Sequence, residues 1–138
     1  MSRPPPPSGA APPAQAFTSD GEGIDLPPLA REICARSRSE FPDEEERYGP
    51  VGIEWCLHDN QYLPAWAIQD ARDATVVLSD QAVWPAGILK ARAFPVARLA
   101  RTLELASEVV RSSPALRELA HSTSEHLAAS AVTVAALP

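Results

Sequence analysis

The sequence predicts an all-α protein, an antiparallel bundle of four to five helices that follows a disordered, proline-rich N-terminal tail. The stretch from Phe94 to Arg111 repeats apolar residues three and four positions apart, and this spacing gathers side chains on one stripe of a helix: Val96, Leu99, Leu103, Ala106 and Val110. Such a helix needs a partner surface, so other helices should pack on it. In addition, more than half of the fifteen prolines fall within the first 28 residues.

Residues 1–26 make up the predicted tail. Proline, glycine, alanine and serine dominate this segment, and Phe17 is its single aromatic residue. Burial of so little apolar surface would not offset the conformational entropy that is lost when the segment is ordered. We therefore predict a disordered tail over residues 1–26 and a helical bundle domain over residues 27–138.

Prolines and glycines divide the first half of that domain. A first helix is expected from Pro28 to the residue before Pro42, with a narrow apolar face at Leu29, Ala30, Ile33 and Cys34. Gly49-Pro50 is expected to form a turn. The helix after it should break just before Pro64, into halves of roughly 51–62 and 64–73, because an interior proline removes a hydrogen bond and clashes with the preceding turn.

Three further helices are expected in the second half. Ser79 or Asp80 can cap a helix that runs to about Ala93, and its buried stripe is predicted at Trp84, Ile88 and Ala91. The helix of residues 95–111 follows. A last helix should start at Pro114, with a stripe at Leu116, Leu119, Thr123, Leu127, Ala131 and Val134. Residues 127–138 carry no charge, so they either complete the core or cover a partner.

Composition argues against several classes of protein. A formal net charge of −6 disfavours a general nucleic-acid or anionic-membrane binder, and no apolar run is long enough to span a bilayer. The N-terminus lacks the apolar region of a secretory signal, and Cys34 and Cys56 are the only cysteines, which predicts a cytoplasmic protein with reduced thiols. The chain has no glycine-rich phosphate loop, nucleophile elbow or zinc-peptidase motif, so no motif predicts an enzyme.

Aromatic side chains concentrate in the middle of the chain. Gathered between helices, they can line a pocket for a planar ligand, and the candidate ligand-binding residues are Trp55, His58, Tyr62, Trp66 and Trp84. The alternative is that these side chains only supply the bulk of a small core. His58 titrates near neutral pH and can contact a ligand, or it can simply pack against a neighbouring helix.

Two further groups of residues bear on binding. Cys56, His58 and Asp59 are metal-ligating residue types close together, and Cys34 could approach them, but structural zinc sites show two paired-ligand segments that this chain lacks. No metal ligand is therefore assigned. A local basic ridge could meet an acidic partner or a phosphate, or it could be a solvated helix face; it consists of Lys90, Arg92, Arg98 and Arg101.

Residues 62–110 contain, in order, YL, an acidic residue at Asp70, LSDQAVW, a leucine and AR, FP, and RLARTLELASEVV. This segment resembles the small helical caps and globin-like sensory bundles of bacterial signalling and cobalamin-binding proteins. The resemblance implies a four- or five-helix sensory or regulatory module that can close over a cofactor. It does not identify the cofactor.

The main functional hypothesis is therefore a non-enzymatic, cytoplasmic regulatory or protein-interaction module of a bacterial signalling system. One alternative is a sensor that binds a planar small molecule between the helices. Another is a metal-dependent protein that uses Cys56, His58 and Asp59. A protein partner is expected and a small-molecule ligand is the alternative, whereas neither a nucleic acid nor a membrane is expected.

Overall fold

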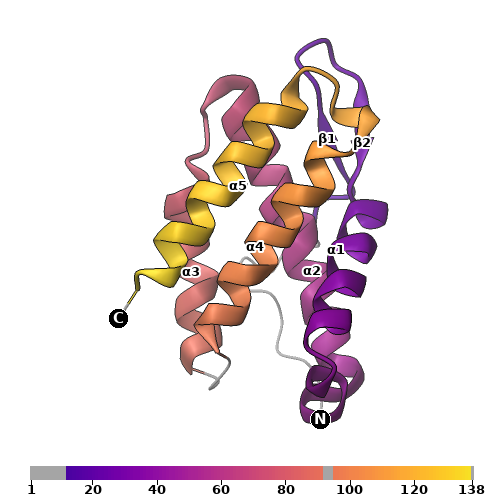
Figure 1. The fold of residues 1–138 in the computed structure, drawn as a ribbon. Coiled ribbons are helices and arrows are strands. Elements are labelled where there is room, and N and C mark those ends of the chain that lie inside the picture. The colour runs from indigo at the N-terminus through magenta and orange to yellow at the C-terminus, as the bar shows by residue number, and fades with distance from the viewer. Residues whose placement is uncertain (1–11, 92–94, 138) are drawn as a thin grey trace.

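The computed structural model describes residues 12–91 and 95–137. Within them, two short strands precede five helices: β1 (Gln15–Phe17), β2 (Gly23–Asp25), α1 (Leu26–Glu40), α2 (Asp43–Asp73), α3 (Leu78–Ala91), α4 (Val96–Arg111) and α5 (Leu119–Ala135). Successive helices run in opposite directions, and the hairpin lies at the end of the bundle where α4 leads into α5 (Figure 1). The predicted antiparallel helical bundle is confirmed, with a small sheet added to it.

The hairpin corrects the prediction of disorder over residues 1–26. β1 and β2 pair antiparallel, with Ala16 opposite Ile24, and both side chains are buried with Leu26 in the core. The few apolar side chains of this segment pack against helices that come later in the chain, and that burial offsets the entropy lost on ordering. Residues 1–11 lie outside the described residues.

Ion pairs and hydrogen bonds attach the hairpin to the bundle. Arg72 of α2 donates a hydrogen bond from Nη1 to the carbonyl oxygen of Phe17 at 3.0 Å. Arg117, between α4 and α5, pairs through Nη2 with Oε2 of Glu22 at 2.5 Å. Both contacts join residues far apart in the sequence, so no local pattern could predict them.

Ile24→Val tests the order of the hairpin. The side chain of Ile24 is only 1% exposed, so loss of one methylene group should lower the free energy of unfolding by about 0.5–1.5 kcal/mol in urea denaturation. Phe17→Leu, at an exposed position of the other strand, is the control and should change it by less than about 0.5 kcal/mol. If residue 24 were disordered, the two variants would unfold alike.

Helix α1 has the predicted apolar face, and its Leu29, Ala30, Ile33 and Cys34 side chains are buried. The helix begins at Leu26, two residues before the predicted start at Pro28. Pro27 and Pro28 occupy its first turn, where a missing N–H costs no helical hydrogen bond.

Helix α2 is kinked at Gly49 and continuous through Pro64. Gly49 has φ 62° and ψ −160°, and it is the only residue with non-helical dihedrals between the first and last residues of α2. The predicted break before Pro64 is therefore wrong. A proline inside a helix costs about 3 kcal/mol, but burial of Leu63 and of Ile68 contributes about 1.5–3 kcal/mol each, which favours a continuous helix at this point.

The predicted stripe of α3 is wrong at Ala91 and only partly right at Ile88. Among its described side chains, those of Leu78, Ala82, Ala86 and Leu89 are buried, whereas Ile88 is half-buried and Ala91 is exposed. The side chain of Trp84 lies outside the described part of the structure. Periodicity favoured the large residues, but the small Ala82 and Ala86 face the bundle on a helix that packs on α5.

The N-terminus of α3 is capped from another helix. The backbone N–H of Leu78 donates to Oδ2 of Asp70 in α2 at 3.0 Å, and the same oxygen lies 3.5 Å from Nδ1 of His126 in α5. Ser79 and Asp80, the predicted caps, instead fall inside the first turn. The cap could not be predicted locally because its acceptor is eight residues earlier.

Helices α4 and α5 form the most extensive helix pair, and their predicted stripes are confirmed. Leu99, Leu103, Ala106 and Val110 are buried, as is every predicted stripe residue from Leu116 to Val134, and only Val96 is half-buried. The uncharged C-terminal segment thus contributes to the core.

The last helix starts later than predicted. Pro114–Leu116 forms a single 3-10 turn, and Arg117 has φ 52°, so α5 begins only at Leu119. A buried polar contact then joins α4 to α5, because Oγ of Ser107 lies 2.8 Å from both the carbonyl oxygen and Oγ of Ser124. None of the helices that the structure describes is both long and apolar enough to cross a membrane.

Candidate functional site

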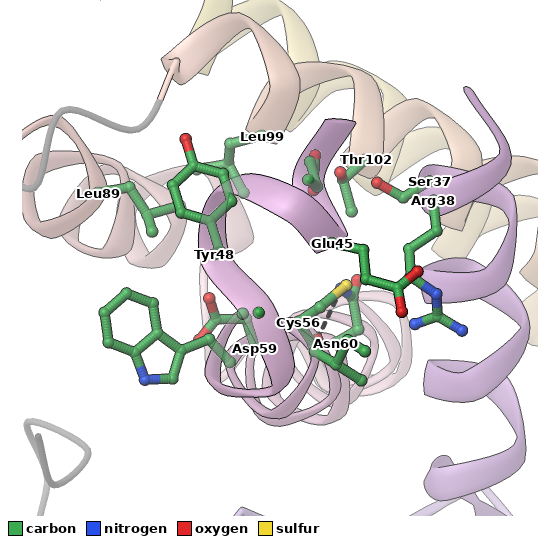
Figure 2. Close-up of a pocket in the computed structure, with 15 residues that line it drawn as sticks. Ser37, Arg38, Glu45, Tyr48, Cys56, Asp59, Asn60, Leu89, Leu99 and Thr102 are labelled. Atoms are coloured by element: carbon green, nitrogen blue, oxygen red, sulfur yellow. Dashed lines mark hydrogen bonds between the residues drawn. The ribbon is translucent and has the colours of Figure 1, made fainter. Parts of the chain in front are cut away.

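A cavity of about 260 Å³ lies where α1, the N-terminal half of α2, the end of α3 and the start of α4 meet (Figure 2). Most of its wall is apolar, and the large apolar and aromatic side chains that line it are Tyr48, Ile53, Trp55, Leu89 and Leu99. Figure 2 shows Tyr48 on the same side as Leu89 and Leu99. Small-molecule sites in proteins are concave and mostly apolar in the same way, with few polar groups.

Two glycines shape this cavity. Gly49 adopts a positive φ, which side chains other than glycine rarely adopt, and the kink there turns the short segment of residues 43–48 across the cavity. A Cβ atom on Gly52 would lie 2.6 Å from Cβ of Tyr48. Gly52 therefore leaves room for Tyr48, so the two glycines together position the aromatic wall.

An ion-pair cluster holds residues 43–48 against α4. Nη2 of Arg98 lies 2.9 Å from Oδ2 of Asp43, and this hydrogen bond lowers the pKa of Asp43. Nη1 of Arg98 lies 3.7 Å from Oε1 of Glu44, whose side chain is 18% exposed. Burial raises the pKa of Glu44, although the nearby guanidinium opposes that effect.

These ion pairs correct the interpretation of the basic ridge. Arg101 pairs with Glu40 of α1 at 2.7 Å and with Glu104 at 3.5 Å, while Arg98 binds the acidic start of α2. Acidic side chains thus neutralise both arginines, and the two residues tie α4 to its neighbours. Arg92 lies outside the described residues.

Cys34 and Cys56 form a disulfide that links α1 to α2, with Cα atoms 6.1 Å apart. Reduced thiols were predicted, so this expectation is wrong. The bond also removes the thiolate on which a metal site at Cys56, His58 and Asp59 would depend. In the part of the chain that the structure describes, no three His, Cys, Asp or Glu residues lie close enough to hold a metal ion.

Asn60 lies beside the disulfide in the α2 wall of the cavity (Figure 2). Its side chain is 2% exposed, and Nδ2 donates to the carbonyl oxygen of Cys56 at 2.9 Å. A carbonyl oxygen only accepts hydrogen bonds, so this contact fixes the orientation of the amide. The other end, Oδ1, is buried and has no hydrogen-bond partner among the described residues.

Of the predicted ligand-binding residues, only Trp55 is shown to line this cavity. His58, Tyr62 and Trp66 form a row along α2. The rings of His58 and Tyr62 meet edge-to-face with centroids 5.0 Å apart, and those of Tyr62 and Trp66 are tilted with centroids 5.2 Å apart. His58 is buried, and its Nδ1 lies 3.2 Å from Oδ1 of Asp59. Helical spacing alone could not show which side of α2 faces a cavity.

Sequence reasoning missed most of the cavity wall, including Glu44, Tyr48 and Asn60. Two signals were present. Gly49-Pro50 and Gly52 fall close together next to a helical pattern, which marks a kink or a close approach. Asn60 occupies a helical stripe of apolar residues, and a buried polar residue in such a stripe needs a specific partner.

Comparison of the chain with protein-family models, with curated proteins and with solved structures finds no match. The resemblance of residues 62–110 to sensory bundles therefore stays a prediction.

Proposed function

We propose that this chain is a non-enzymatic regulatory module of a bacterial signalling system, which senses a small molecule bound in the cavity between α1, α2, α3 and α4. The observation that carries the proposal is the cavity itself. Its volume of about 260 Å³ falls just below the range of drug-sized ligand sites, so it suits a smaller molecule. A protein partner would then read the liganded state of the bundle.

The wall favours a ligand with a flat apolar body. Tyr48 and Trp55 lie on the two sides of the Gly49 kink, and both line the cavity with the aliphatic side chains of Leu89 and Leu99. Aromatic rings attract planar ligands through offset or edge-to-face contacts. Among the described lining residues there is no histidine, lysine or free thiol, because Cys56 is held in the disulfide.

The disulfide bears on where the module works. Disulfides are rare in the cytosol of mesophilic organisms, where thiols are kept reduced. The Cys34–Cys56 bond therefore weighs against the predicted cytoplasmic location, and we infer an oxidising compartment. Alkylation of thiols in intact cells, followed by mass spectrometry, would find both cysteines unmodified if the bond is present there.

Ligand binding can be tested by filling the cavity. Ile53 lines it and is half-buried, so Ile53→Trp should occupy part of the space. In ligand-observed NMR with a fragment library, planar fragments should show binding to the parent chain. Most of that binding effect should be lost with Ile53→Trp. Val83→Trp, at an exposed position of α3, is the matched control and should behave as the parent does.

A fragment library that gives no binding to the parent chain at millimolar concentrations would contradict the proposal. Fragments that bind Ile53→Trp as tightly as the parent must bind outside the cavity, and this result would also contradict the proposal. Circular dichroism on both variants would establish that each one is folded.

A further inference from the structure

Charges around the cavity are unbalanced. Three carboxylates line it, from Glu44, Glu45 and Asp59, against the single guanidinium of Arg38. Arg98 and Arg47 are further cations near Glu44. Both pair with Asp43, at 2.9 Å and 3.5 Å, and Arg98 lies 3.7 Å from Oε1 of Glu44. A ligand that adds a positive charge would improve this balance, and one that adds a negative charge would worsen it.

Hydrogen bonding at the cavity is unbalanced in the same direction. Oδ1 of Asn60 and Oε1 of Glu44 are buried acceptors, and neither has a hydrogen-bond partner among the described residues. Asn60 is more than nine-tenths buried, and its amide cannot turn because Nδ2 is bound to Cys56. A buried acceptor without a donor is destabilising, so the ligand that completes this wall should donate hydrogen bonds.

Aromatic rings at the cavity fit the same kind of ligand. Tyr48 and Trp55 line it from either side of the kink. The faces of aromatic rings attract cations, most strongly those of tryptophan, but the guanidinium of Arg47 already lies over the Tyr48 ring, 5.4 Å from its centroid. Tyr48 therefore offers the ligand an apolar contact. Carboxylates and acceptor oxygens thus make a site that attracts positive charge, while Tyr48 and the aliphatic wall accept an uncharged body.

From this arrangement we propose that the cavity binds a small organic cation, with an ammonium or amidinium group that faces Glu44, Asp59 and Asn60, and an apolar body against Tyr48 and Leu99. The inference rests on the proposed function and names the class of its ligand. A bare metal ion fits less well, because most of the wall is apolar.

The test uses three probes with the same ring and different charge: 2-phenylethylamine, 2-phenylethanol and phenylacetate. The amine is protonated at neutral pH, the alcohol is neutral and the acetate is an anion. Each is titrated into the full chain by calorimetry or NMR. We expect the amine to bind at least about tenfold more tightly than the alcohol, as one charged hydrogen bond implies, and the acetate to bind most weakly.

Variants then show which carboxylates contact the charged group of the amine. Glu44→Gln and Asp59→Asn each keep the shape of the side chain. Each should lower the affinity for the amine about tenfold and leave the affinity for the alcohol unchanged. Glu54→Gln is the matched control, because Glu54 is an exposed acid on the same helix that is not in the cavity wall. It should change neither probe. The two wall variants are independent, so one that does not fold leaves the other to be measured.

The outcomes separate the two proposals. Equal affinities for the amine and the alcohol, or a preference for the acetate, would contradict the proposal that the ligand is a cation. The cavity would then be a site for a neutral or anionic ring. A cation preference that survives both Glu44→Gln and Asp59→Asn would also contradict that proposal. If none of the three probes binds and the fragment library gives no binding either, both proposals fail.

Discussion

Leu103→Ala is expected to lower the free energy of unfolding by about 2–5 kcal/mol, because it empties a fully buried position in the middle of α4. Leu103 is 0% exposed and belongs to the core shared by all five helices. The truncated side chain would leave a space that its neighbours fill only in part. Urea denaturation followed by circular dichroism measures the change.

Arg101→Ala is the control on the same helix. Arg101 pairs with Glu40 and Glu104 at the surface, and exposed ion pairs contribute about 0–1 kcal/mol. The variant should therefore lose no more than that. Comparable losses from the two substitutions would mean that the bundle buries a different face of α4.

Removal of the disulfide should have the second large effect. The bond closes a loop between residues 22 positions apart, and a loop of that length stabilises the folded chain by about 3 kcal/mol in the chain-entropy model. Cys34→Ala combined with Cys56→Ala is expected to lower the free energy of unfolding by that amount in urea denaturation.

Reductant supplies the control for this experiment. Dithiothreitol should destabilise the parent chain to about the level of the double variant and leave the double variant unchanged. A parent chain whose thiols are shown to be reduced, yet which unfolds at the same urea concentration, would contradict a stabilising role for the bond.

The helices that sequence predicted best are those with long, regular apolar stripes. In α4 and α5, positions such as Leu99, Leu103 and Leu127 recur every three or four residues, and burial of such a stripe is decided by the helix itself. The face of α1 was predicted for the same reason. Local periodicity is sufficient to predict the buried face where the apolar pattern that decides burial lies within one helix.

Prediction was wrong where distant contacts decide. Ile24 orders the hairpin through packing on helices that come later, Asp70 caps α3 from another helix, and Pro64 is held in α2 by its buried neighbours. The stripe of α3 consists partly of alanines, whose small side chains give a weak periodic signal. None of these effects is visible in a short window of sequence.

The site was less predictable than the fold. Trp55 was identified because aromatic residues are common in ligand sites. The glycine and proline at positions 49 and 50 predicted a turn, whereas the structure has a kink at Gly49 inside a helix that begins at Asp43. The cavity, however, combines Arg38 of α1, Leu89 of α3 and Leu99 of α4 with residues of α2. Periodicity within each helix does not show how four helices pack together. The pairing of Cys34 with Cys56 likewise depends on how α1 packs on α2.

The kink at Gly49 divides α2 into a segment that forms part of the cavity wall and a segment that forms part of the core. Residues 43–48 include no buried residue, yet Glu44, Glu45 and Tyr48 face the cavity, whereas the part of α2 after the kink holds core residues such as Leu63. Surface substitutions change stability by about 0.5 kcal/mol or less. Apart from Asp43 and Glu44, whose ion pairs with Arg98 hold the segment on α4, this hexapeptide can therefore vary while the core of the bundle stays unchanged. On the proposal that the cavity binds a small molecule, a mutant library restricted to positions such as Glu45 and Tyr48 would search new specificities on a constant scaffold.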